Sequence, residues 1–568
     1  MKRFFIFSGI AMACAAIGWI TYLAAASAPP PLTKYVPAGP LVYLEAKDFS
    51  ALLSDWNSSP QKKQWLKGDN YEVFSRSRLF LRLKGASDQF AAATGLPPDM
   101  DFLSQVAGER SVFALYDIGN LQFLYITYLP SAKAMQTTLW QTRSKFEPRS
   151  AGGVNFYLRR DPQSQREVAF AVSGDYLLLS TREDLMAGAL QLMSGKQDRT
   201  VNGEQWWTQS TAAAGQAGDL RMVLNLEELV PNGYFRTYWV QQNITDLKQY
   251  SASVSDLYRS GKQYREERVL IKKDEPKQAS SPDGRTATAD VVRFVPAEAG
   301  VYEAEANPTS DAMFALLETK LLAPHLGPVP PSQLAPQARL TSGEPGSGSD
   351  LETHIDQAPV ERPAAQQSVS ALKELLDKTP LLASLQVQST APDQTGVFVC
   401  VHSAVVLVAG SEWNQAAVHA ALTDFVRPGL TASQLGVGWQ QESEYQKLDG
   451  LWPLVTLVRG KFLLISDDAG LAEAILANFS RKSDREPADL LAGFNHQQER
   501  ANFARFSKLV DRPSATVTDN ERRTSEPQFF SNNMASLSST LAAVSAETIE
   551  VRSEGNKERQ TVVYYWSQ

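Results

Sequence analysis

The side chains best suited to acid–base or metal chemistry all lie in the second half of the chain. Histidines are the first candidates because imidazole titrates near neutral pH and binds metal ions. The five are His325, His354, His402, His419 and His496. No close His-x-x-x-His pair or cysteine at ligand spacing accompanies them. We therefore predict no metal site, and a histidine mechanism common to both halves is excluded.

Two serines at matching places in a repeated phrase are candidate nucleophiles. The phrase at 174–180 ends in Ser180 and returns, 286 positions later, at 460–466, which ends in Ser466. Ser180 precedes Glu183 by three residues, which is a capping-box pattern, and two acids follow Ser466, as at a helix start. No Gly-x-Ser-x-Gly elbow surrounds either serine. The pattern predicts helix caps rather than nucleophiles.

The remaining catalytic motifs are short and isolated. Residues 59–62 match Ser-x-x-Lys without the companion motifs of penicillin-interacting enzymes. The carboxylate pairs at 99–101 and 442–444 have no counterpart in the other half, which favours solvated faces. No phosphate-binding loop or dinucleotide glycine pattern occurs, so we predict no cofactor. A hydrolase with a carboxylate or serine site in the second half stays open as an alternative.

Large aromatic side chains provide the positive signal for binding. They are concentrated in three short segments, at 206–207, 234–239 and 564–566, and neighbouring rings cannot all point into one core. We predict that some of them line a contact surface, because aromatic residues are enriched at interfaces. The alternative is that the rings divide between two buried layers. The candidates are Trp206, Trp207, Tyr234, Phe235, Tyr238 and Trp239.

The sequence segments expected to form the secondary structure around these residues occur twice in the chain. The phrase Val-Pro-Ala at 36–38, followed by Val-Tyr at 42–43, returns as 295–297 and 301–302, which is 259 positions later. Val-Phe at 112–113 matches 397–398 at an offset of 285. Since several phrases recur in the same order, we predict two tandem copies of one domain, with a net insertion of 26 residues in the second copy.

These matches divide the chain into domains. Copy A spans residues 35–273 and copy B spans residues 294–566, with a polar linker at 274–293 between them. The extra length of copy B falls on residues 327–366, which are rich in Pro, Gly and Ser. Such a composition cannot bury enough apolar surface to order itself, so we predict a disordered insertion there.

The hydrophobic pattern predicts an α+β fold. Short apolar runs, at 41–46, 111–116, 121–129, 167–173 and 176–180, indicate strands, and most are joined by tight turns. Stretches at 48–56, 59–66, 71–94 and 182–193 have helical spacing. Each copy should therefore be a mostly antiparallel sheet with helices packed on one face.

The N-terminus carries a membrane-targeting pattern. Lys2 and Arg3 precede a run of twenty uncharged residues ending at Leu23, which is long enough to span a bilayer. Length favours a retained single-pass helix over residues 1–28, with a signal cleaved after Ala26 as the alternative. The two basic residues should stay in the cytoplasm. A Pro-rich spacer at 29–34 would then lead to a periplasmic body at a bacterial inner membrane.

The charge composition of the chain limits the classes of partner that it is expected to bind. The chain has 568 residues, with 55 Lys and Arg against 62 Asp and Glu, and no long basic cluster. Nucleic acid is therefore an unexpected partner, and contact with the membrane is expected through the N-terminal helix only. Two cysteines, Cys14 within the apolar run and Cys400, cannot form a disulfide within the body.

The repeated opening phrase, Val-Pro-Ala-x-x-x-Val-Tyr at 36–43 and 295–302, resembles that of a family of uncharacterised bacterial envelope proteins. That family carries a domain of unknown function, which would be present here as two copies. The resemblance implies an envelope location and brings no active site with it.

Taken together, the sequence favours a non-catalytic periplasmic binding or scaffold module whose partner is an envelope protein or an apolar ligand. The alternatives are the hydrolase described above and a carrier of lipid or another apolar ligand, which would use a cavity between sheet and helices.

Overall fold

A computed structural model describes residues 31–76, 78–238, 247–274, 280–322, 371–392, 399–431, 438–442, 444–449, 454–500, 502 and 543–566. These residues form two compact units. Unit 1 contains the described residues up to Leu66, together with Tyr71–Arg259 and Glu267–Asp274. Unit 2 contains Lys67–Asn70, Ser260–Glu266 and the described residues from 280 onward.

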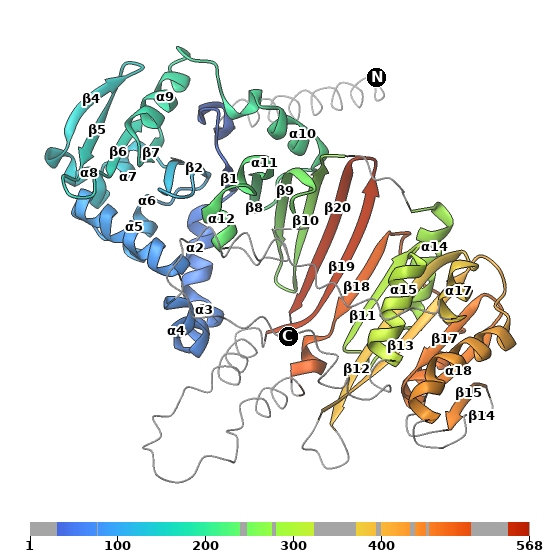
Figure 1. Ribbon diagram of the computed structural model, residues 1–568. Helices are drawn as coiled ribbons and strands as arrows, with labels where there is room; N and C mark the ends of the chain where they lie inside the picture. Colours follow the sequence, from blue (N-terminus) through green and yellow to red (C-terminus); the bar gives the residue numbers. More distant parts are fainter. Residues whose placement is uncertain are drawn as a thin grey trace, which may run out of the picture. The chain divides into compact units, whose positions relative to one another are not determined.

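Unit 1 is an α+β body built on an antiparallel sheet (Figure 1). Its strand order is β4-β5-β6-β7-β3-β2-β1-β8-β9, followed by the part of β10 from Glu267 onward, so the first strand lies in the interior of the sheet. The strands are β1 (Val42–Ala46), β2 (Ser111–Asp117), β3 (Gln122–Tyr128), β4 (Glu147–Ala151), β5 (Val154–Arg160), β6 (Glu167–Ser173), β7 (Tyr176–Ser180), β8 (Leu220–Asn225), β9 (Tyr250–Arg259) and β10 (Gln263–Lys272).

The helices of this half cover both faces of the sheet, so the prediction of helices on one face is wrong. Helices α9 and α10 share a core with Tyr43, whereas α5 and α6 share another with Tyr125 on the opposite face. The central strands are continuous apolar runs because both of their faces are buried. The helical segments are η1 (Leu32–Tyr35), α2 (Phe49–Ser58), α3 (Pro60–Lys67), α4 (Asp69–Ser75), α5 (Arg78–Thr94), α6 (Met100–Val106), α7 (Ser131–Ala134), α8 (Thr138–Gln141), η2 (Thr142–Lys145), α9 (Glu183–Met193), η3 (Val201–Gly203), α10 (Gln205–Ala213), α11 (Leu226–Leu229) and α12 (Gly233–Tyr238).

Unit 2 repeats the strand order of unit 1. Its order is β14-β15-β16-β17-β13-β12-β11-β18-β19-β20, and each of these pairings is antiparallel. The strands are β11 (Val301–Ala306), β12 (Leu381–Pro392), β13 (Val399–Ala409), β14 (Gly438–Gln441), β15 (Gln446–Asp449), β16 (Leu454–Arg459), β17 (Phe462–Ser466), β18 (Leu490–Phe494), β19 (Val544–Glu554) and β20 (Lys557–Trp566). The helical segments are α14 (Pro282–Val291), η4 (Val292–Phe294), α15 (Ser310–Leu317), η5 (Glu318–Leu322), α17 (Ala371–Asp377), α18 (Gln415–Thr431) and α19 (Ala469–Ala477).

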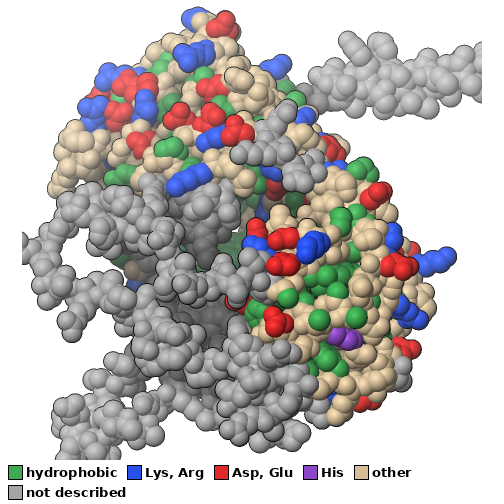
Figure 2. Space-filling view, turned by 45° about the vertical axis from the view of Figure 1, so that its right-hand side comes forward, with side chains coloured by type: hydrophobic (Ala, Val, Ile, Leu, Met, Phe, Trp, Pro, Cys, Tyr) green, Lys and Arg blue, Asp and Glu red, His purple; other side chains and the backbone are tan. Residues whose placement is uncertain are grey.

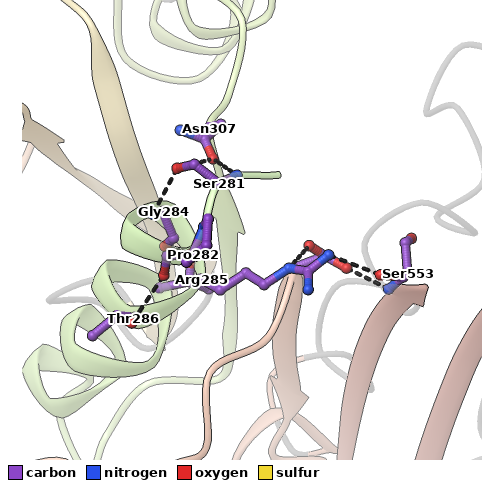
Figure 3. A network of polar contacts seen from close by, with 9 residues as sticks. Ser281, Pro282, Gly284, Arg285, Thr286, Asn307 and Ser553 are labelled. Carbon is purple, nitrogen blue, oxygen red and sulfur yellow. Dashed lines mark hydrogen bonds and ion pairs between the residues drawn. The ribbon is translucent and has the colours of Figure 1, made fainter. Parts of the chain in front are cut away.

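A polar network holds α14 against the sheet of unit 2 (Figure 3). Ser281 caps α14 by accepting a hydrogen bond from Gly284 N at 3.0 Å, and Asn307 Oδ1 accepts one from Ser281 N at 2.7 Å. One turn into the helix, Arg285 Nε donates to Asp489 Oδ1 at 2.7 Å, and Arg285 Nη2 donates to the Ser553 carbonyl at 2.8 Å. These contacts fix the N-terminal end of α14 through charge-assisted hydrogen bonds.

The strand registers align the two units residue by residue. Val42 in β1 corresponds to Val301 in β11, which is 259 positions later, as the repeated phrase predicts. Val112 pairs with Glu45 in β1, and Leu385 pairs with the corresponding residue of β11, Ala304. Val112 therefore corresponds to Leu385, which is 273 positions later. Matching Val112 with Val397 is therefore wrong. Short apolar phrases repeat along any buried strand, and only the paired neighbour fixes the register.

Several predicted helices and strands agree with the structure, and one predicted helix is divided into two. Strands 41–46, 167–173 and 176–180 correspond to β1, β6 and β7, and Ser59 caps α3 by accepting a hydrogen bond from Lys62 N at 3.1 Å. The predicted helix over 71–94 is interrupted between α4 and α5. The anchor and leading spacer positions at 1–30, and the insertion at 327–366, lie outside the described residues. No described helix combines the length and apolar composition that a bilayer crossing requires.

Candidate functional site

The candidate site is a cavity of about 520 Å³ within unit 1, between the sheet and helices α5 and α6. Its floor follows one row of paired residues across four strands. Leu44 pairs with Phe113, Phe113 with Tyr125, and Tyr125 with Leu179. Side chains alternate between the faces of a strand, so one row of partners presents four carbon-rich side chains on the same face. A cavity of this volume is in the usual range for a small-molecule site.

Two helices supply the wall opposite the sheet. On α5, the lining side chains are spaced three and four residues apart, at Leu83, Ala86, Ser87 and Phe90, which places them on one face of the helix. Leu83 remains 45% exposed, so the cavity reaches solvent beside α5. The shorter α6 contributes its apolar side chains and begins at the cap Asp99, which accepts from Phe102 N at 2.9 Å.

Three hydroxyl groups of the wall are already engaged in hydrogen bonds. Ser111 Oγ lies 2.6 Å from Thr127 Oγ1, and Tyr125 Oη donates to the Val106 carbonyl at 2.9 Å. Thr181 Oγ1 accepts from Phe123 N at 2.9 Å. Burial raises the pKa of Tyr125, so this phenol stays neutral. The wall therefore offers a ligand mainly apolar contact, and Arg166 is the one charged side chain among the described residues that line it.

In unit 2, two of the four corresponding positions are polar, and the other two are buried apolar residues. Leu44, Phe113, Tyr125 and Leu179 correspond by register to Glu303, Gln386, Val405 and Ile465. In the neighbouring row, the pair Leu115–Phe123 corresponds to Gln388–Ser403. Ala46 likewise corresponds to Glu305. The same backbone pattern therefore carries an apolar floor in unit 1, whereas in unit 2 the β11 and β12 part of that face is polar.

Because of Glu305, the stability of unit 2 should depend measurably on pH. Burial, and then the neighbouring Glu303, raise the pKa of Glu305 above its ordinary value. The folded state then binds the proton more tightly, so the free energy of unfolding should fall as pH rises through the folded pKa. Glu305→Gln should remove this fall and stabilise unit 2 at neutral pH by about 0.5 kcal/mol.

Urea unfolding at several pH values between about 4 and 7 would measure the effect. Glu303→Gln is the control, because Glu303 is exposed and its replacement should give a smaller gain. A Glu305→Gln change that is independent of pH would contradict the assignment.

The predicted aromatic residues lie in two different cores and on the surface. Trp207 is buried against Tyr43, with ring centroids 4.6 Å apart, and Trp206 is half-buried beside it. Phe235 is buried in a second cluster, whereas Tyr234 is 51% exposed, with the Arg82 guanidinium 5.8 Å from its ring centroid. The side chain of Tyr238 and all of Trp239 lie outside the described residues.

The two matching serines are structural in both units. Ser180 Oγ lies 3.0 Å from the Phe123 carbonyl and accepts from Arg182 N at 3.2 Å. Ser466 Oγ makes the equivalent contacts, at the same distances, with the Ser403 carbonyl and Asp468 N. Both side chains are fully buried at strand ends. The predicted capping role is wrong in detail, because the helices are preceded directly by Arg182 and Asp468.

The described histidines each contact a different partner. His402 Nδ1 lies 3.8 Å from Asp468 Oδ2, and His496 Nε2 lies 3.6 Å from Glu547 Oε2. His419 stacks on Trp439, and burial lowers the pKa of this imidazole. His325 and His354 lie outside the described residues. Among the residues that the structure describes, no three metal-ligating side chains come together.

The carboxylate pairs also have ordinary surroundings. Asp99 caps α6, and Asp101 lies exposed in the first turn of that helix. Glu442 and Glu444 are exposed at the connection between β14 and β15. On the face drawn in Figure 2, acidic and basic side chains lie intermixed.

Comparison with known proteins identifies no family for the chain. No family model matches it, and no curated protein matches it. Two crystal forms of TP0453 match among solved structures, both at 11% sequence identity and over 44% of this chain. They are covered over 82% and 83% of their own length, with TM-scores of 0.23 and 0.22. At these scores the similarity does not establish a shared fold.

Proposed function

We propose that the chain is a non-catalytic binding protein that holds a hydrocarbon chain in the cavity of unit 1. The observation that carries the proposal is an open cavity of about 520 Å³ whose wall is almost entirely carbon. With about 30 Å³ for each water-sized group, the cavity has room for roughly 17 such groups. Burying ten methylene groups would contribute about 8 kcal/mol before the costs of association.

The contrast with unit 2 supports an assignment to unit 1 alone. If the apolar floor only stabilised the fold, we would expect the same apolar residues in both units. Instead, Glu303, Glu305 and Gln386 occupy the positions of Leu44, Ala46 and Phe113. A carboxylate such as that of the half-buried Glu305 disfavours a hydrocarbon neighbour, because the hydrocarbon would take water from the charge without replacing its hydrogen bonds.

We also infer that the two units descend from one duplicated domain. Their strand orders coincide, and matched polar contacts recur at matched places. Asp219 accepts a hydrogen bond from Arg259 N, and its counterpart Asp489 accepts one from Ser553 N. Within this proposal, one copy binds and the other is the scaffold. We further propose, from the N-terminal sequence alone, that a single-pass helix tethers both in the periplasm of a bacterium.

Site-specific photocrosslinking in the full chain tests the binding proposal. A photoreactive amino acid replaces Phe113 on the cavity floor, and the register-matched control carries it at Gln386. After irradiation of cells, intact-mass and peptide analysis should find a hydrocarbon-containing adduct at position 113 and none at 386. Equal adducts at both positions, or protein adducts alone, would overturn the proposal.

A further inference from the structure

We infer that the ligand of this cavity is an amphiphile whose anionic end is bound by Arg166. This inference rests on the proposed function and names the chemical class of the ligand. Arg166 lies at the connection into β6 and is the one charged side chain that the structure describes in the cavity wall. Its Nε donates to Gln89 Oε1 at 2.7 Å, which ties the guanidinium to α5 on the opposite side of the cavity.

Within the described part of the chain, Arg166 lies near another positive charge and forms no ion pair with an acid. Its pKa is lowered by burial and, second, by the nearby charge of Arg82. Arg82 Nη2 donates to the Gly119 carbonyl, and its Nε is buried without a hydrogen-bond partner. Among the described residues, no carboxylate forms an ion pair with either arginine. Two half-buried like charges disfavour each other unless an anion joins them.

The geometry indicates which anions suit the site. A guanidinium presents donors in a planar fork, which matches a carboxylate or a phosphate through two parallel hydrogen bonds. Since the rest of the wall is apolar, the hydrocarbon tail would lie over Phe113 and Leu179 with the charged end at Arg166. The ligand class is therefore a long-chain carboxylate or an alkyl phosphate, including an anionic lipid headgroup.

Competition photolabelling of the full chain, in a fixed amount of non-ionic detergent, tests this inference. The probe is a long-chain fatty acid bearing a diazirine, and the readout is labelling of the peptides that contain α5 and β2. Three competitors of equal chain length are compared: the fatty acid, the alkyl phosphate and the fatty alcohol. For the unaltered chain, the preferred anion should compete at least about tenfold better than the alcohol.

Arg166→Gln should reduce the anion preference to less than about threefold, chiefly because the two anions compete less well. Arg159→Gln is the matched control, because it removes an equal charge from the same hairpin outside the cavity wall. It should retain the preference. The relative strength of the carboxylate and phosphate arms identifies the headgroup.

The outcomes separate this inference from the proposed function. If the acid, phosphate and alcohol compete equally in the unaltered chain, the role of Arg166 is overturned while the cavity remains a hydrocarbon site. Retention of the anion preference in Arg166→Gln overturns it as well. If no competitor affects labelling and no cavity peptide is labelled, the proposed function itself fails.

Discussion

The variant Ala86→Trp should lose most hydrocarbon binding without losing stability. Ala86 lies on the cavity side of α5, and an indole ring there would occupy space that a ligand needs. If it displaces three methylene groups, binding weakens by about 2.4 kcal/mol, or about fiftyfold. The indole ring fills part of the cavity rather than crowding a packed core, so the free energy of unfolding should be unchanged or higher. Labelling by the diazirine fatty acid measures the loss.

Leu81→Trp provides the matched control for this substitution. Leu81 lies on the same helix, is 57% exposed and does not line the cavity. The same indole should therefore leave labelling within about twofold of the unaltered chain. Equal labelling of Ala86→Trp and Leu81→Trp would show that the cavity is not the binding site.

The variant Asp256→Asn should destabilise unit 1 by about 3–5 kcal/mol. Asp256 is 2% exposed and accepts two hydrogen bonds from Arg221, from Nε at 2.8 Å and from Nη2 at 2.7 Å. It also accepts from Gly218 N at 3.1 Å. The amide keeps the shape of the carboxylate but leaves the Arg221 charge uncompensated in a desolvated place. Native-state hydrogen exchange at the amides of β8 and β9 measures the change within this unit.

Unit 2 again contains the control. By register, Arg221 and Asp256 correspond to Leu491 and Glu550. Glu550 is partly exposed and pairs with Arg552 at 2.7 Å, so Glu550→Gln should cost less than about 1 kcal/mol. The double variant Arg221→Leu/Asp256→Leu should recover most of the loss, because no unpaired charge remains. A cost for Asp256→Asn no larger than that for Glu550→Gln would refute the buried-pair argument.

Local sequence signals predicted the elements that depend on local chemistry. The strands β6 and β7 follow from their β-branched and aromatic residues on either side of Gly174, whose φ of 55° suits the tight turn. Helix α9 follows from its apolar spacing. The capping box at Ser180 failed because the buried hydroxyl bonds to the neighbouring strand instead. Tertiary contact overrode a local preference.

The cavity could not be read from local pattern, although one signal was present. Volume arises where side chains from segments far apart in sequence fail to meet, and Phe113, Leu179 and Ala86 come from three such segments. The repeated phrase held the useful clue. After the shared Val-Tyr, copy A continues with Leu44 and copy B with Glu303. A change from apolar to acidic at one register position of a duplicated strand indicates that the copies use that face differently.

The central place of β1 also determines when unit 1 can fold. Val42 pairs with Leu224, which is synthesised 182 residues later, so β1 lacks one neighbour until β8 has emerged. At a translation rate of about 5–20 residues per second, this interval lasts roughly 10–35 seconds. During that time the nascent chain exposes an unpaired strand edge, and such edges promote aggregation. A holding chaperone is therefore expected to act on this chain before its own sheet closes.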